Sequence, residues 1–248
     1  MVAKGLLTVS ALAAAAASAT YAGTVYKQTR RTDSRRMTRQ NTVPDSLHIS
    51  KSVNEIVDPR GYSISFDTRS ISIDIPPHRR NVSDEELLSR FTKAFYGGAV
   101  IRPERFVLQN LRPNLVNFSD ALQVWCVEQI SDSSLLPTYT KIFGTFQVVD
   151  SLIHSQADFS KGAESYIDIG FGKDQSSFAG LHRFSAFRPT PESQDHVVLQ
   201  FACQVASGPR PNFVASAIQY AGFFHRIYAD LLFRESVGEV EKWLHSRD

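Results

Sequence analysis

Four consecutive segments in the second half of this 248-residue chain alternate apolar and polar residues with a period of two. They span residues 143–154, 164–171, 180–188 and 196–206, and Gly, Asp, Ser and Pro residues separate them. Such alternation is typical of strands that bury one face, and the separating residues favour turns. We therefore expect four consecutive antiparallel strands.

The chain changes to a helical period after the last of these segments. Residues 207–211, Ser-Gly-Pro-Arg-Pro, interrupt the sheet, and residues 212–245 are amphipathic throughout. We predict one long helix there. Its expected apolar stripe consists of Phe213, Ala217, Tyr220, Phe224, Ile227 and Leu231.

A further β signal precedes these strands. Residues 62–66 and 70–75 alternate strictly, which predicts a hairpin with a tight turn at residues 67–69. Ser83 and Glu86 then form a capping box that opens a helix, and Gly97 with Gly98 supplies its end.

The region between that helix and the later strands is less regular. Pro103 can begin a helical turn and Pro113 forces a break. Residues 118–130 suit either helix or strand by spacing, and we predict a helix there.

The N-terminal segment bears on location. Residues 3–23 are apolar or small apart from Lys4, and six cations follow between Lys27 and Arg39. As a membrane anchor of residues 1–26, the segment is long enough, and the cations would place the domain in the cytosol or the mitochondrial matrix. As a secretory signal it has a small-residue cleavage site at residues 17–19. As a mitochondrial presequence it is rich in Ala, Ser and Arg.

Two further observations weigh on the secretory alternative. Asn81 and Asn117 each begin a glycosylation pattern, although such short motifs often occur by chance. Cys126 and Cys203 lie in apolar runs, where buried reduced thiols are expected rather than a disulfide. A membrane-anchored domain in a reducing compartment is the favoured interpretation, and secretion after cleavage stays open.

The basic character of the chain is confined to its beginning. The net charge is +2, yet the first 40 residues hold an excess of Lys and Arg over one acid, and the remainder has more acidic than basic residues. An acidic body argues against nucleic acid as a partner, whereas the leading cations suit a membrane surface. Residues 27–59 are expected to be a basic, polar linker to a single α+β domain at residues 60–248.

The predicted order is a hairpin, a helix, short helices, four antiparallel strands and a long C-terminal helix. This order resembles the helix-grip arrangement of the START and Bet v 1-like superfamily. The resemblance implies a curved antiparallel sheet that wraps a long last helix and encloses an apolar cavity. The alternative is a hot-dog fold, in which the helix beginning at Asp84 would be the central one.

If the chain has that arrangement, alternation identifies the cavity walls. One face of the last strand would look towards the C-terminal helix. The expected apolar ligand-binding residues are Phe184, Phe201, Phe224 and Tyr228, and packing in an ordinary core is the competing interpretation.

Polar residues embedded in these apolar faces are the candidates for chemistry, because burying them is costly unless they are paired or used. His182 and Arg188 share a strand face with Phe184 and could point together towards a ligand carbonyl or carboxylate. His225 lies at helical spacing from Tyr228. The candidate catalytic residues are His182, His225 and Asp168, and Arg188 is a candidate ligand-binding residue.

No nucleophile elbow, metalloprotease helix, Walker loop or dinucleotide-binding motif occurs in the sequence. We therefore expect no cofactor. We also expect no metal site, because the seven histidines are scattered. Two functions remain: binding of a lipid, isoprenoid or polyketide-like molecule by a membrane-tethered domain, or cofactor-independent isomerase, cyclase or hydrolase chemistry on a hydrophobic substrate.

Overall fold

The computed structural model describes residues 2–116, 122–154, 163–172, 178–188, 195–207 and 214–246. For residues 2–14 and 214–223 it describes the helical backbone alone. The helices are α1 (Val2–Thr29), α2 (Asp45–His48), η1 (Ser52–Val57), η2 (Pro77–Arg79), α3 (Asp84–Gly97), α4 (Arg102–Leu111), η3 (Val127–Gln129) and α5 (Val214–His245). The strands are β1 (Thr38–Gln40), β2 (Ser63–Asp74), β3 (Gln123–Val124), β4 (Lys141–Ile142), β5 (Phe146–Leu152), β6 (Ser165–Gly172), β7 (Phe178–Phe187) and β8 (His196–Ser207).

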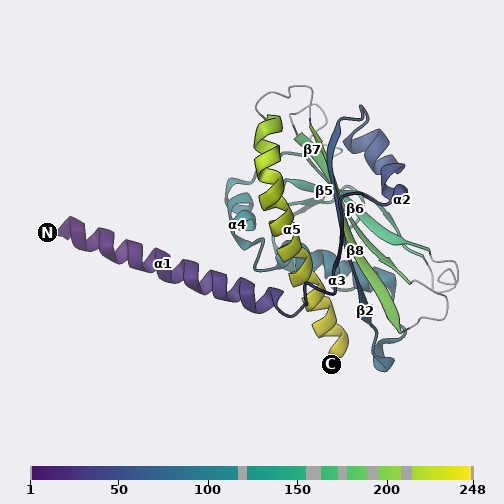
Figure 1. The fold of residues 1–248 in the computed structure, drawn as a ribbon, viewed down its shortest axis with the longest axis horizontal. Helices are drawn as coiled ribbons and strands as arrows, with labels where there is room; N and C mark the ends of the chain where they lie inside the picture. The colour runs from purple at the N-terminus through teal and green to yellow at the C-terminus, as the bar shows by residue number, and fades with distance from the viewer. Residues whose placement is uncertain are drawn as a thin grey trace.

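These elements form an α+β fold, as predicted. The described strands make one sheet in the order β1-β2-β8-β7-β6-β5-β4-β3. Every neighbouring pair is antiparallel except β3 and β4. The long C-terminal helix α5 and helix α3 pack together on one face of this sheet (Figure 1).

The four predicted consecutive strands are present as β5 to β8, and each pairs with the next. Their inner faces carry the apolar residues of the alternation. Val197, Leu199 and Phe201 are buried in the main core between the sheet and the two long helices. The period-two pattern therefore identified the strands and, in β8, the face that packs on the two long helices.

The predicted hairpin at residues 62–75 was wrong, because β2 runs without a turn from Ser63 to Asp74 and pairs with β8 along its length. The middle of the strand is polar because its inner face holds an ion pair between Asp67 and Arg69. On the outer face, the Thr68 hydroxyl donates to the carbonyl of Thr42 at 2.6 Å. The segment was mistaken for a turn because polar residues interrupt the apolar alternation.

The helix predicted after residue 83 is α3. The Oγ of Ser83 accepts a hydrogen bond from the backbone N–H of Glu86 at 3.1 Å, and the helix ends at Gly97. The turn expected at Pro103 is the start of α4. The helix predicted over residues 118–130 was wrong where the structure describes it, since residues 123–130 form the short strand β3 and the single turn η3.

Helix α5 confirms the predicted C-terminal helix, but its buried stripe is rotated. Phe224 is 72% exposed and Ile227 is 46% exposed. The side chains of Phe213, Ala217 and Tyr220 lie outside the described residues. Apolar residues surround much of this helix, so spacing alone did not fix which side is buried. The buried side consists of Ala229, Leu232, Phe233, Val237, Val240 and Leu244.

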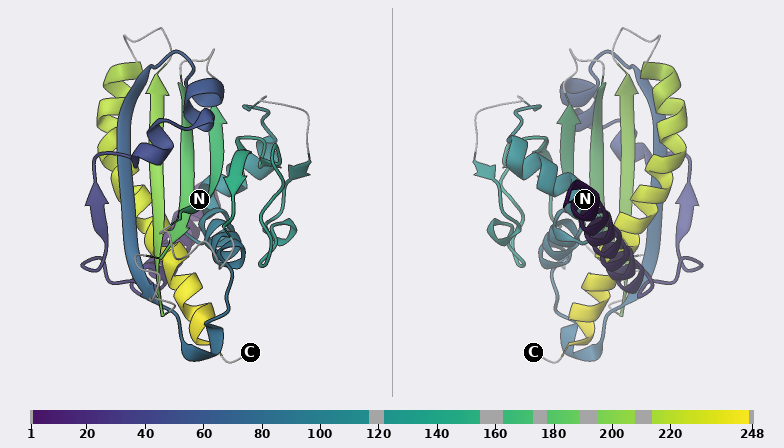
Figure 2. Two further views of the ribbon diagram at one scale, coloured as in Figure 1. Left: turned by 90° about the vertical axis from the view of Figure 1, so that its right-hand side faces the viewer. Right: turned by 90° about the vertical axis from the view of Figure 1, so that its left-hand side faces the viewer.

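Residues 38–57 pack on the sheet rather than forming a linker. Strand β1 pairs with β2, and η1 contacts β5, β6 and β7. Leu47, Val53 and Val57 are buried there in a second core with residues from the outer face of the sheet. The left panel of Figure 2 shows α2 in front of the strands, on the side away from α1. The sheet is therefore covered on both faces.

Helix α1 projects away from the sheet, on the side where α3, α4 and α5 lie (Figures 1 and 2). Arg31 and Glu239 form an ion pair next to the base of α1. The apolar part of the predicted anchor includes residues 3–14, whose side chains lie outside the described ones. In the described part of the chain, no helix is long and apolar enough to cross a bilayer.

The two cysteines are free thiols. Cys203 is buried, as expected, whereas Cys126 is exposed. The glycosylation pattern at Asn117 lies outside the described residues.

Candidate functional site

A cavity of about 350 Å³ lies between the inner face of the sheet and helices α3, α4 and α5. Its walls are mainly aromatic and aliphatic. A volume of this size is at the lower end of the range for small-molecule sites. The lining residues are Ser65, Phe95, Ile101, Glu104, Leu115, Thr145, Phe146, Phe171, Gly172, His182, Phe201, Val205, His225, Tyr228, Ala229 and Leu232.

His182 lies in the cavity wall among aromatic rings. Its imidazole stacks on Phe146 with ring centroids 5.9 Å apart, and the rings of Phe171 and Phe201 lie at 4.7 and 5.1 Å. The alternation of β5, β6, β7 and β8 brings these side chains to one face of the sheet. The result is an apolar surface with one imidazole embedded in it.

The imidazole of His182 is neutral at physiological pH. Burial, followed by the positive charge that His225 can carry, lowers the pKa of His182 from 6.5 to about 3. Its Nδ1 lies 3.2 Å from the hydroxyl of Tyr96. Burial also raises the pKa of Tyr96, so that this phenol keeps its proton. The pair can therefore share one neutral hydrogen bond without a buried charge.

A second polar pair links α4 to α5 beside the cavity. The Tyr228 hydroxyl donates to Oε2 of Glu104 at 2.8 Å. Burial, and then the charge of Glu104, raises the pKa of Tyr228. The phenol therefore remains a hydrogen-bond donor, and it fixes the position of α4 over the cavity.

His225 lines the same cavity from α5. Its Nε2 lies 3.7 Å from Oδ1 of Asp67, which is too long for a hydrogen bond. Burial lowers the pKa of His225, although Asp67 opposes this shift. Four of the predicted site residues therefore line this cavity: His182, Phe201, His225 and Tyr228.

Asp168 is not part of this cavity. It pairs with Arg183 across β6 and β7, whereas the neighbouring pair Ile169 and His182 occupies the inner face. Its carboxylate accepts two hydrogen bonds of 2.7 Å from the Arg183 guanidinium, and both side chains are buried. Burial raises the pKa of Asp168 although Arg183 opposes the shift. Sequence alternation alone could not say which face of the sheet would hold the cavity.

Arg188 directly follows β7, which ends at Phe187, and it is bound outside the cavity. Its guanidinium donates to Oδ1 of Asp84 at 2.9 Å and to the carbonyl of Val82 at 3.3 Å. Ser165 donates to the other oxygen of Asp84 at 2.7 Å. These bonds hold the first turn of α3 on the sheet, and Arg188 does not line the cavity.

The remaining predicted ligand-binding residues separate into two groups. Phe184 is fully buried between the sheet and α3, where its ring lies 5.3 Å from that of Phe91, and it does not line the cavity. Phe224 points away from the cavity and is exposed. Phe224 is exposed because α5 is rotated relative to its predicted phase.

Sequence reasoning missed several residues of the cavity wall. Phe95 lies in the predicted helix after residue 83, and Phe146 and Phe171 lie in predicted strands, yet nothing in their spacing distinguished a cavity wall from a packed core. Glu104 could not be found because α4 was predicted only as a helical turn. Tyr96 makes the hydrogen bond to His182 from the opposite layer.

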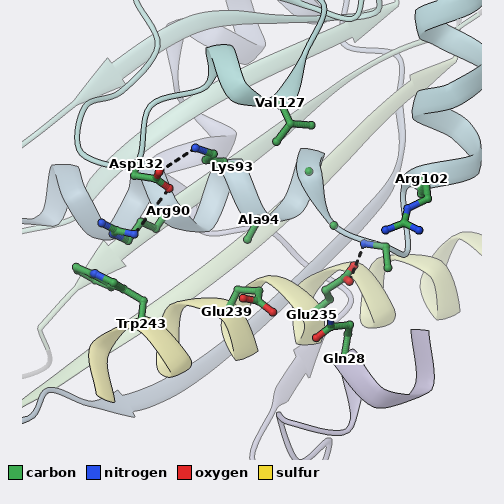
Figure 3. A pocket seen from close by; sticks show the side chains of 13 residues that line it. Gln28, Arg90, Lys93, Ala94, Arg102, Val127, Asp132, Glu235, Glu239 and Trp243 are labelled. Carbon is green, nitrogen blue, oxygen red and sulfur yellow. Dashed lines mark hydrogen bonds and ion pairs between the residues drawn. The ribbon is translucent and has the colours of Figure 1, made fainter. Parts of the chain in front are cut away.

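A second hollow of about 370 Å³ lies between α3, α5 and the base of α1, and its lining is charged (Figure 3). Asp132 accepts from Lys93 at 2.9 Å. Glu235 accepts from the backbone N–H groups of Ala99 and Val100 at 2.7 and 2.8 Å. These bonds link the helices around the hollow. Gln28 Oε1 and Arg90 Nε, from two other residues of its lining, are buried without a hydrogen-bond partner among the described residues.

No family model matches the chain, and no curated protein matches it. Among solved structures, it is similar to a hypothetical protein from Helicobacter pylori. The match has 13% sequence identity and a TM-score of 0.28, and it covers 68% of this chain and 86% of the other. A likeness at this TM-score establishes neither a shared fold nor a shared function.

Proposed function

We propose that this protein binds a hydrophobic small molecule, of the lipid, isoprenoid or polyketide-like class, in the cavity between the sheet and α5. One observation carries the proposal: a cavity of about 350 Å³ with mainly apolar walls lies beside a well-packed core. Protein interiors normally contain few voids larger than a water molecule. A ligand that fills this space would supply the packing contacts that the residues of the cavity wall lack.

The few polar groups of the wall support binding rather than chemistry. Tyr228 already donates to Glu104, and His182 already contacts Tyr96. An efficient general base has a pKa near the working pH, whereas His182 has a pKa of about 3. These groups suit the recognition of a single polar end on an otherwise apolar ligand.

The helix-grip architecture remains part of this proposal. The first long strand, β2, lies beside the last strand, β8, in the sheet. In the chain, helices α3 and α4 come between β2 and the later strands. Helix α5 follows β8 and covers the inner face. These features support the proposed helix-grip arrangement, which would place a cavity between the sheet and α5.

A cofactor-independent enzyme is the second candidate. His225 and Tyr228 both line the cavity one turn apart on α5, and the imidazole of His225 is about one third exposed. A substrate that entered the cavity could exchange a proton with this imidazole. Binding is favoured because Asp168, the predicted carboxylate partner, lies on the other face of the sheet.

We also propose that the domain works at a membrane surface, held there by α1. Helix α4 borders the cavity through Glu104, and its outer side exposes Phe106 and Leu111 at 65% and 74%. Arg102 and Arg112 flank these residues at the two ends of α4. Exposed apolar side chains flanked by cations suit an anionic lipid surface. An apolar ligand could then pass between bilayer and cavity with little exposure to water.

Binding can be tested with a fluorescent polyene fatty acid, cis-parinaric acid, added to the full chain in a non-ionic detergent. We expect saturable fluorescence at one site for the wild-type chain. Ala229→Phe places a phenyl ring in the cavity from α5 and should abolish the signal. Failure of the wild-type chain to bind this probe or a polyisoprenoid competitor would count against the proposal.

Ala202→Phe is the matched control. Ala202 is fully buried but faces the second core on the outer side of the sheet. Overpacking costs about 1–3 kcal/mol at either position. The control should therefore lose stability while keeping the probe, and loss of binding in both variants would show that general destabilisation releases it.

A further inference from the structure

Three potential metal ligands from three separate elements meet beside the cavity. Asp67 on β2 and Cys203 on β8 are direct cross-strand partners. His225 reaches them from α5, which packs on both strands. One ligand atom from each residue lies within 4.8 Å of the other two. No sequence pattern indicated this group, because Cys203 and His225 are 22 positions apart and Asp67 was expected in a turn.

The spacing is close to that of a tetrahedral zinc site. Nitrogen and oxygen ligands at about 2.0 Å from a tetrahedral ion lie roughly 3.3 Å apart. Nε2 of His225 lies 3.7 Å from Oδ1 of Asp67. A shift of a few tenths of an ångström would therefore bring these two atoms into range, and the ligand atoms of all three residues lie within 4.8 Å of one another.

The hydrogen bonds around the group leave these atoms available. Arg69 binds the other oxygen of Asp67, Oδ2, and also pairs with Asp230. Oδ1 therefore faces His225. Nε2 of His225 is buried from solvent and has no hydrogen-bond partner among the described residues. A buried nitrogen with no partner is costly in a folded protein, and coordination would satisfy it.

We propose that Asp67, Cys203 and His225 bind a divalent transition-metal ion, with Zn²⁺ as the ion that this mixed carboxylate, thiolate and imidazole set matches best. Three protein ligands leave a fourth position. His225 also lines the cavity, as do Ser65 and Val205, each two residues from one of the other ligands. The fourth position would then be open to water or to a polar end of the cavity ligand.

The charges balance when the ion binds. Burial raises the pKa of the Cys203 thiol, so the metal-free protein carries S–H there. Zn²⁺ binding forms a Zn–S bond, breaks the S–H bond and releases that proton to water. The thiolate and the Asp67 carboxylate together offset the charge of the ion, and Arg69 and Asp230 remain paired with each other. Metals bind the neutral form of imidazole, so His225 would add no charge to the site.

Cobalt substitution tests the site in the full chain. Co²⁺ added to the metal-free protein should produce a thiolate-to-cobalt charge-transfer band and the intense visible bands of tetrahedral cobalt, and one equivalent of Zn²⁺ should remove both. Cys203→Ser should lose the charge-transfer band. Cys126→Ser, which alters the exposed cysteine, should retain it. No band in the wild-type chain, or loss of the band in Cys126→Ser alone, would overturn the proposal.

His225→Gln and Asp67→Asn should each weaken Zn²⁺ binding by about 100-fold or more, because each removes or weakens a ligand. Arg39→Gln is the control for the neighbouring ion-pair chain, since Arg39 pairs with Asp230 but supplies no ligand. It should change the affinity little. Equal affinity in all three variants would contradict the assignment.

X-ray absorption of the Zn²⁺-loaded wild-type chain avoids variants that fail to fold. One sulfur neighbour at about 2.3 Å with nitrogen and oxygen neighbours at about 2.0 Å is expected. A shell of oxygen and nitrogen without sulfur would overturn the proposal. The outcome is independent of probe binding in the cavity, so the two proposals can fail separately.

Discussion

The hydroxyl of Tyr96 on α3 lies 3.2 Å from Nδ1 of His182 on β7, and this contact joins the helical layer to the sheet at the cavity. Both groups are buried and neutral. The contact lets an otherwise apolar wall carry an imidazole without a buried charge, and it leads to a prediction for acid stability.

We expect His182 to make the fold sensitive to acid. Its pKa falls from 6.5 to about 3 on folding. Between these values the unfolded chain binds a proton that the folded chain does not, so the free energy of unfolding decreases as the pH falls through this window. The slope from this residue is at most about 1.4 kcal/mol per pH unit. His182→Gln should reduce the dependence of the free energy of unfolding on pH, as measured by urea unfolding at several pH values.

The ring of His182 can also be followed directly. In the folded wild-type chain, its ¹⁵N chemical shifts should remain those of a neutral imidazole at pH 5. A ring that titrates near pH 6.5 would contradict the burial described here.

Arg188→Met should destabilise the protein by about 3–5 kcal/mol, because Asp84 would be left as a buried carboxylate without its partner. Arg80→Met is the control, since Arg80 pairs with Asp195 at 2.9 Å but both side chains are about half exposed. Its cost should be below about 1 kcal/mol. Unfolding in urea measures both. Unchanged stability in Arg188→Met combined with lost probe binding would instead give Arg188 a role in the ligand site.

Gly98→Ala should cost about 1–3 kcal/mol, because its Cβ would overlap the Glu235 carboxylate that binds the backbone of Ala99 and Val100. Gly23→Ala is a matched change on α1, where an added Cβ meets nothing within 4 Å. That control should be neutral or slightly stabilising. Thermal unfolding of both variants checks the prediction, and equal midpoints would show that Glu235 can move without loss.

The double variant Phe106→Ser/Leu111→Ser should slow the transfer of cis-parinaric acid from vesicles to the reconstituted full chain by about tenfold, because it removes the exposed apolar side of α4. Stopped-flow fluorescence measures the rate. Ile49→Ser changes a residue that is 76% exposed next to α2, on the other side of the sheet, and should leave the rate unchanged. Equal rates in all three proteins would rule out a role for this surface.

Strict local patterns predicted the elements well. The alternation of residues 196–206 identified β8, and Ser83 with Glu86 located the start of α3, because both signals depend on a few neighbouring residues. The α+β class and the covering C-terminal helix followed from the order of these elements. The same logic failed at Asp67 and Arg69, whose polarity suggested a turn. Arg69 pairs with Asp67 and also with Asp230, which lies more than 150 residues further along the chain.

The candidate site was harder to predict because it depends on which faces meet. His182 and His225, which were proposed because both interrupt apolar faces, line the cavity. Asp168 interrupts an apolar face in the same way, yet it lies on the outer side with Arg183. Phe224 was misplaced because periodicity in α5 permits more than one phase. Only the register of the sheet shows on which face Asp168 lies, and only the packing of α5 shows that Phe224 is exposed.

Native mass spectrometry of the full chain, purified in a detergent that is removed in the instrument, tests the central claim most directly. We predict a population heavier than the protein by the mass of one apolar molecule, which organic extraction recovers and which Ala229→Phe lacks. A wild-type chain that shows only its own mass, before and after incubation with membrane lipid extract, would contradict the claim that the cavity is a binding site.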